Sequence, residues 1–269
     1  MELSDVSQMH KSSERMDGQA SLQTHMVSYI VHPTPPQPAH HLAHQHLRFG
    51  TRAFRASGAA SDHAHHNVLR LRIHKTFIGG IIESLFRITS KATGTWLQSK
   101  FPEWFLPDKI VLKRQKENWE EEFDHEIVAY NRLRPLQGLT IPKLYGMVQY
   151  ANTRALILSD IGGSCIATPG GAVLTEQDIE PLFHQALTSL NEYGICHDDT
   201  KLDNFHLVTD DGKDKIMIVD LESADFDQTE EELAYTAKSK TKSLLRQYRN
   251  HLKCLEHDGV LLPRRPVRR

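Results

Sequence analysis

Asp199, Asn204 and Asp220 are the side chains of this 269-residue chain whose types and spacing most clearly predict chemistry. Residues 205–219 hold two apolar runs around a turn cluster, in which Gly212 is free to take a positive φ. Because such a hairpin returns the chain to its start, the three polar groups are expected to lie close together. Carboxylate and amide oxygens hold Mg²⁺ against phosphates, and a further carboxylate can deprotonate an attacking hydroxyl. The spacing therefore favours phosphoryl-transfer chemistry.

The motif H-D-D-T-K-L-D-N at 197–204 resembles the catalytic-loop pattern H-R-D-L-K-x-x-N of the protein-kinase-like superfamily. The segment D-L-E at 220–222 stands where those proteins carry D-F-G. The resemblance implies that Asp199 is the catalytic base and that Lys201 in the catalytic loop contacts a phosphate. It also implies that Asn204 and Asp220 are metal ligands and that His197 holds the loop. An ordinary acidic surface loop between two strands is the alternative interpretation.

A lysine and a glutamate upstream fit the same resemblance. The apolar run at 110–114 predicts a strand that carries Lys113, and it resembles the V-A-I-K strand, which places its lysine on the α- and β-phosphates. Residues 119–133 have helical spacing and include Glu126, so this helix resembles helix C of a kinase. Lys113 is expected to pair with Glu126, and the glutamates at 120–122 are rival partners.

The adjacent glycines Gly79 and Gly80 lie between strand-like runs at 69–73 and 81–88. This is the expected place of a glycine-rich loop over the nucleotide phosphates. The pattern G-x-G-x-x-G is absent, and two adjacent glycines are equally typical of a tight hairpin. Both interpretations of the pair stay open.

Ser159, Asp160 and Ile161 follow a predicted strand at 155–158. The resemblance implies that they form the hinge, whose backbone groups bind adenine, and a plain linker is compatible with the same residues. A helix is predicted to begin after Thr175, and its buried face leads the chain directly into the catalytic-loop motif.

The resemblance covers residues 68–255 and is strongest to a divergent fungal kinase-like branch. It implies an α+β, two-lobed protein-kinase-like fold, with a small antiparallel β-sheet lobe plus helix C and a shortened, mainly helical C-lobe. The expected divisions are a disordered His/Pro-rich segment 1–66, an N-lobe 67–158, a C-lobe 159–258 and a basic tail 259–269.

The two terminal segments are assigned by composition. Residues 1–66 are rich in histidine and proline and have few periodic apolar positions, so they are expected to bury too little surface to order themselves. The basic tail is interpreted as a solvated charged end, with an acidic partner or a nuclear address as alternatives.

Composition narrows the class of protein. A net charge of −2 gives no indication of nucleic-acid or membrane-surface binding, and no apolar run is long enough for a membrane span. Three scattered cysteines favour a reducing compartment, so an intracellular location, cytoplasmic or nuclear, is expected.

The sequence therefore predicts an ATP- and Mg²⁺-dependent phosphotransferase that acts on a hydroxyl group of a protein or small molecule. Lys201 favours the protein-kinase-like type, because aminoglycoside-type enzymes usually carry H-G-D-x-H-x-x-N in this loop. One alternative is a pseudokinase that binds nucleotide or a partner without transfer, which the missing activation segment favours. The other is a small-molecule kinase of the aminoglycoside-phosphotransferase type. Asp198 and Glu222 depart from the family pattern and add negative charge near the expected phosphates.

Overall fold

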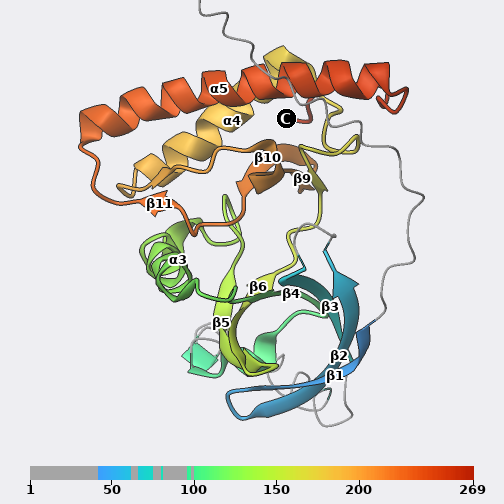
Figure 1. Ribbon diagram of the computed structural model, residues 1–269, viewed down its shortest axis with the longest axis vertical. Coiled ribbons are helices and arrows are strands. Elements are labelled where there is room, and N and C mark those ends of the chain that lie inside the picture. The colour runs from blue at the N-terminus through green and yellow to red at the C-terminus, as the bar shows by residue number, and fades with distance from the viewer. Residues whose placement is uncertain (1–41, 62–65, 75–79, 81–95, 98–99) are drawn as a thin grey trace, which may run out of the picture. The chain divides into compact units, whose positions relative to one another are not determined.

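A computed structural model describes residues 42–61, 66–74, 80, 96–97 and 100–269, which all lie within one compact unit, Ala39–Arg269. The fold is mixed α+β, with antiparallel strand pairing in its sheets (Figure 1). Every helix in the described part of the chain is too short or too polar to cross a membrane.

The larger sheet has six strands in the order β1-β2-β3-β4-β6-β5, and each neighbouring pair is antiparallel. Its strands are β1 (Leu42–Phe49), β2 (Arg52–Ala60), β3 (Val68–His74), β4 (Lys109–Arg114), β5 (Leu144–Tyr150) and β6 (Thr153–Ser159). Buried and exposed residues alternate along β2 and β3, so one face of these strands packs into a core.

β1 and β2 lie inside the segment 1–66 that composition predicts to be disordered, so this prediction is wrong for both strands. Leu47 and Phe54 are each only 3% exposed and belong to the core under the sheet. Gly58 allows β2 to approach β3, because a Cβ there would stand 1.9 Å from the carbonyl oxygen of Arg70. The part of that segment before β1 lies outside the described residues.

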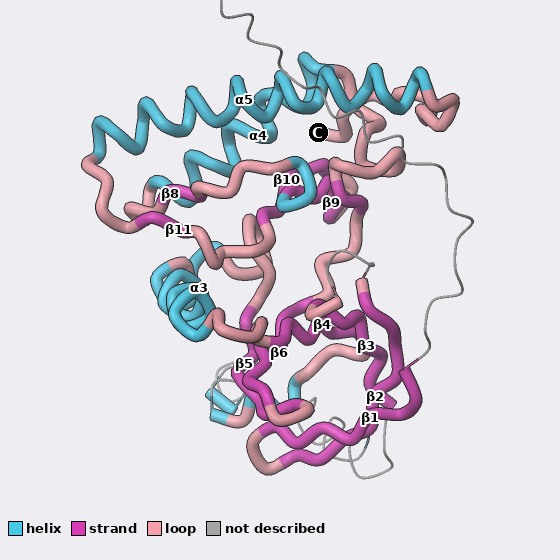
Figure 2. Tube along the Cα trace, in the orientation of Figure 1, coloured by secondary structure: helices cyan, strands magenta, loops and turns pink. Residues whose placement is uncertain are grey.

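In the part of the chain that the structure describes, the helices with defined bounds are α3 (Glu120–Arg132), α4 (Glu176–Asn191), α5 (Glu230–His257) and the 3₁₀-helices η1 (Pro102–Phe105), η2 (Arg134–Leu136) and η3 (Leu202–Asn204). The helix predicted after Thr175 is α4, and the Thr175 hydroxyl accepts a hydrogen bond from the Asp178 amide as its N-cap. α5 is one continuous helix that begins with a capping box of Thr229 and Glu232. α4 and α5 pack against each other (Figure 2).

Two small sheets carry the predicted catalytic segment. One has the order β10-β9-β7, and the other pairs β11 with β8. Their strands are β7 (Ser164–Cys165), β8 (Cys196–His197), β9 (Phe205–Asp210), β10 (Lys213–Ile218) and β11 (Ala224–Asp225). The hairpin predicted over 205–219 is confirmed, because β9 and β10 pair antiparallel with Phe205 opposite Ile218. The Val219 amide then donates to the Asn204 carbonyl at 2.9 Å, which brings both ends of the hairpin together.

The basic tail is attached to β10, so its interpretation as a solvated end is wrong for Arg265, whereas the Arg268 side chain is exposed. Asp214 is buried, and its carboxylate accepts two hydrogen bonds from the Arg265 guanidinium at 2.6 and 3.0 Å. The Arg268 amide donates to the same carboxylate at 2.8 Å, and the Thr209 hydroxyl donates at 2.7 Å. A buried carboxylate needs such partners, because burial without them would carry a large desolvation cost.

We expect Phe54→Ala to destabilise the protein by about 3–5 kcal/mol, because it removes a buried aromatic side chain from the core beneath the sheet. Arg55→Ala, on the exposed face of the same strand, should change stability by less than about 0.5 kcal/mol. Urea unfolding measures both. Equal effects of the two substitutions would show that β2 is not part of the cooperative fold.

We expect Asp214→Asn to cost about 3 kcal/mol near neutral pH and progressively less in acid. Burial would raise the pKa of Asp214, but hydrogen bonds from Arg265, Arg268 and Thr209 outweigh it and lower the pKa from 3.8 to about 2. The folded carboxylate therefore stays ionised where the unfolded one takes up a proton. Its stabilisation is complete above pH 3.8 and is lost as the pH falls toward about 2.

The measurement is the difference in unfolding free energy between wild type and Asp214→Asn, followed from neutral pH into acid. Asp210→Asn is the matched control, because Asp210 pairs with Lys215 on the exposed side of the same hairpin. A difference for Asp214→Asn that stays constant with pH would contradict the assigned ion pair.

Candidate functional site

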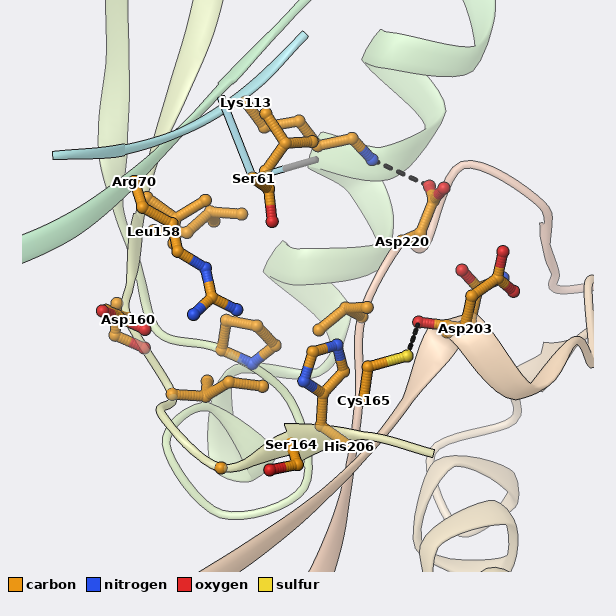
Figure 3. A pocket seen from close by; sticks show the side chains of 18 of the residues that line it. Ser61, Arg70, Lys113, Leu158, Asp160, Ser164, Cys165, Asp203, His206 and Asp220 are labelled. Atoms are coloured by element: carbon orange, nitrogen blue, oxygen red, sulfur yellow. Dashed lines mark hydrogen bonds and ion pairs between the residues drawn. The ribbon is translucent and has the colours of Figure 1, made fainter. Parts of the chain in front are cut away.

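A cavity of about 450 Å³ lies between the larger sheet and the segment that runs from η3 into β9, with further walls from β7 and the end of β10 (Figure 3). This volume is within the range of small-molecule sites. Most residues that the sequence predicts for the nucleotide and metal line it: Lys113, Ser159, Asp160, Ile161, Asn204 and Asp220.

Lys113 is the centre of the charged end of this cavity. It lies on β4, is only 5% exposed, and its Nζ is 2.7 Å from a Glu126 carboxylate oxygen. The same Nζ is 2.8 Å from Asp220 and 3.0 Å from Glu222. The carboxylates of Glu126, Asp220 and Glu222 are close enough to one another to hold a metal ion, with ligand atoms within 4.8 Å. In this structure the lysine ammonium contacts all three.

The predicted partner of Lys113 is the correct one. Glu126 is fully buried on the inner side of α3, and its second oxygen accepts a hydrogen bond from the Leu221 amide at 3.3 Å. The rival glutamates Glu120 and Glu121 are exposed in the first turn of the helix. The apolar stripe that includes Phe123 turns Glu126 inward with it, because the two positions are three residues apart.

Burial and the neighbouring charges shift the pKa values of the Lys113 cluster in opposite directions. Burial alone would lower the pKa of Lys113, but Glu126, Asp220 and Glu222 raise it well above its ordinary value. Burial raises the pKa of Glu126, and Lys113 only partly offsets this. The pKa of Asp220 is lowered, because Lys113 and Lys116 outweigh its burial. Lys113 therefore remains a cation at every physiological pH.

Asp220 has an unusual backbone conformation. Its φ of 62° lies in the left-handed region, which a residue with a side chain adopts rarely and at a cost of about 1–3 kcal/mol. The strained position lies two residues after the end of β10, and its carboxylate contacts Lys113. Strained residues persist where the surroundings determine them, and they cluster at functional sites.

The polar motif at 197–204 forms a compact turn next to the cavity. The Asn204 side-chain amide donates to the Asp199 carbonyl at 2.9 Å and to its carboxylate at 3.1 Å. Lys201 is 3.0 Å from the Asp199 carboxylate, and neither of these two residues lines the cavity itself. His197 is buried with Nε2 3.4 Å from the Val219 carbonyl, which agrees with its predicted structural position.

Gly80 does not line the cavity, so its placement over the nucleotide is wrong, and Gly79 lies outside the described residues. β3 runs with Val68 opposite Lys113 and Arg72 opposite Lys109, so the chain after β3 leaves the sheet at the end away from Lys113. The hairpin between β2 and β3 lies at the Lys113 end instead. Because β1 and β2 are not expected from the sequence, neither is the hairpin between β2 and β3.

Sequence reasoning missed two lysines that pair with Glu222 and Asp198, the acidic residues that depart from the family pattern. Lys116 is 2.6 Å from Glu222, and Lys240 on α5 is 2.5 Å from Asp198. Lys116 follows Lys113 by three residues and could have been noticed as a second cation at the end of β4. Nothing in the local pattern relates Lys240 to Asp198, because the two are far apart in the chain.

No protein-family model matches the chain, and a search of curated proteins finds no match to its sequence.

We expect Lys113→Met to destabilise the protein by about 3–5 kcal/mol, because it leaves buried carboxylates without their cation. The double variant Lys113→Met/Glu126→Leu should cost less than the sum of the two single variants, since the partners are coupled. Urea unfolding of the four proteins measures the coupling. Glu121→Ala on the exposed side of α3 is the control, and additive losses would refute the buried pair.

Proposed function

We propose that the chain is a Mg²⁺-dependent phosphotransferase that moves the γ-phosphoryl group of a nucleoside triphosphate, ATP by resemblance, to a hydroxyl group. The observation that carries the proposal is the buried lysine Lys113. Its ammonium group forms ion pairs with Glu126 on α3 and with Asp220, whose backbone is strained. Lys113 and Asp220 both line a cavity of ligand size. A lysine on a surface strand does not need to be buried and held by carboxylates. A lysine that positions phosphates does.

The residues present fit a magnesium ion. Asp220 offers carboxylate oxygens, and the two hydrogen bonds donated by the Asn204 amide nitrogen leave its Oδ1 as the group that can bind a cation. Both residues line the same cavity. Asn204 and Asp220 would therefore hold Mg²⁺, which supplies charge neutralisation to the phosphates when bound. Lys113 would contact the phosphates, and Glu126 would position Lys113.

In the proposed reaction, Asp199 would act on the acceptor hydroxyl group. Its carboxylate is 30% exposed, so a hydroxyl group can reach it, and Asn204 and Lys201 fix its orientation. In the proposed step the acceptor oxygen forms a bond to the γ-phosphorus while the bond to the departing nucleoside diphosphate breaks. The hydroxyl proton passes to Asp199, and Lys201 offsets negative charge beside it.

The proposal interprets the fold as the two-lobed protein-kinase-like architecture. The six-stranded sheet and α3 correspond to the small lobe, and α4, α5 and the short sheets correspond to a shortened helical lobe. The support is the order of parts along the chain: the lysine strand, the glutamate helix, the hinge, the scaffold helix, the catalytic loop and the acid after a hairpin.

A pseudokinase is the second candidate, and two observations favour it. Glu222 lies 3.0 Å from Lys113, where its carboxylate competes with phosphates for the ammonium. In addition, only a few residues separate β11 from α5, so that region has no long segment for binding a protein substrate. A protein of this type would bind nucleotide or a partner and transfer nothing.

The test is Mg²⁺-ATP turnover by the full chain, measured as nucleoside diphosphate release with and without candidate hydroxyl acceptors. We expect Asp199→Asn to lower turnover by about 100-fold or more, because it removes the base. Asp220→Ala should abolish Mg²⁺-dependent nucleotide binding in calorimetry. Asp211→Asn, at the exposed turn between β9 and β10, is the matched control and should leave both unchanged.

Nucleotide binding that depends on Asp220, without turnover that depends on Asp199, would favour the pseudokinase. Unchanged binding in Asp220→Ala would remove Asp220 from the site and refute the proposal.

A further inference from the structure

The cavity is charged at the end away from Asp220 as well. Figure 3 shows Arg70 and Asp160 together on one side of the cavity, with Asp203 and Asp220 on the other and His206 between them. Arg70 projects from β3 in the larger sheet, and Asp160 follows β6. If phosphates bind near Lys113, the base of a nucleotide lies toward Arg70 and Asp160.

Arg70 and Asp160 face the same cavity without pairing. Neither forms an ion pair with any residue in the part of the chain that the structure describes. Asp160 uses one carboxylate oxygen to accept a hydrogen bond from the Gly162 amide at 3.1 Å, which leaves the other oxygen for a ligand. A guanidinium and a carboxylate thus present hydrogen-bond donors and an acceptor to whatever binds between them.

His206 and apolar side chains provide a surface for a flat ring. Burial and, to a smaller extent, Arg70 lower the pKa of His206 to about 4, so its imidazole is neutral at physiological pH. Leu158 and Val111 from the larger sheet line the same cavity. An uncharged ring in a cavity that apolar side chains also line is a suitable stacking partner for a purine.

We infer that this end of the cavity recognises guanine, so that GTP is bound in preference to ATP; the inference rests on the proposed function. Guanine presents two acceptors, O6 and N7, on the edge that arginine binds with two parallel hydrogen bonds. Its N1–H and exocyclic N2–H₂ are donors for the free oxygen of Asp160. Adenine carries an amino group at the position of O6, so it would set a donor against the Arg70 guanidinium.

The experiment is a fluorescence titration of the full chain with N-methylanthraniloyl-GTP and N-methylanthraniloyl-ATP in the presence of Mg²⁺. We expect wild type to bind the guanine nucleotide about tenfold more tightly or better. Arg70→Leu and Asp160→Asn should each remove this preference while the adenine nucleotide still binds. Asp160→Asn keeps the oxygen that Gly162 uses, so the local turn is preserved even if Arg70→Leu fails to fold.

Arg72→Leu is the matched control, because Arg72 is an exposed arginine two residues along the same strand and does not line the cavity. It should retain the wild-type preference. Equal affinities, or tighter binding of the adenine nucleotide by wild type, would overturn the inference and leave the proposed function in place. Loss of both affinities to the same extent in Asp160→Asn would also overturn it. Absence of Mg²⁺-dependent binding of either nucleotide would overturn the proposed function itself.

Discussion

A single buried ammonium, that of Lys113, organises the charged end of this protein. Burying a lysine is expensive unless anions surround it, and here three carboxylates do so, one from α3 and two from the segment after β10. The requirement acts over long distances in sequence. It fixes the rotation of α3, which must present Glu126, and it fixes the strained backbone at the end of β10, which must present Asp220. The sheet and the hairpin are thereby held in register with each other.

The acidic groups of the cluster outnumber the basic ones. Three carboxylic groups, those of Glu126, Asp220 and Glu222, surround two ammonium groups, those of Lys113 and Lys116. A triphosphate that entered alone would meet this excess and be repelled. A nucleotide that arrives with a divalent cation brings the charge that compensates it. In the proposed enzyme the metal would therefore be required for binding as well as for chemistry.

Patterns within short stretches of the sequence predicted the elements that depend on residues close together in the chain. The helical stripe around Glu126, the N-cap Thr175 and the hairpin between Asn204 and Asp220 are all confirmed, because periodicity, capping and turn chemistry are written over short stretches. β1 and β2 were missed because the histidine- and proline-rich composition around them obscured a short apolar alternation. The pairs Asp214–Arg265 and Asp198–Lys240 could not be predicted, since each joins residues that only the tertiary fold brings together.

The ion pair between Asp214 and Arg265 has a consequence for folding during synthesis. The hairpin of β9 and β10 is synthesised well before residue 265. The Asp214 carboxylate therefore lacks its partners Arg265 and Arg268 until the later segment emerges from the ribosome. An unpaired acid of this kind is held out of the core by its hydration. The hairpin of β9 and β10 can therefore bury the Asp214 carboxylate with these partners only after residues 265–268 have been synthesised.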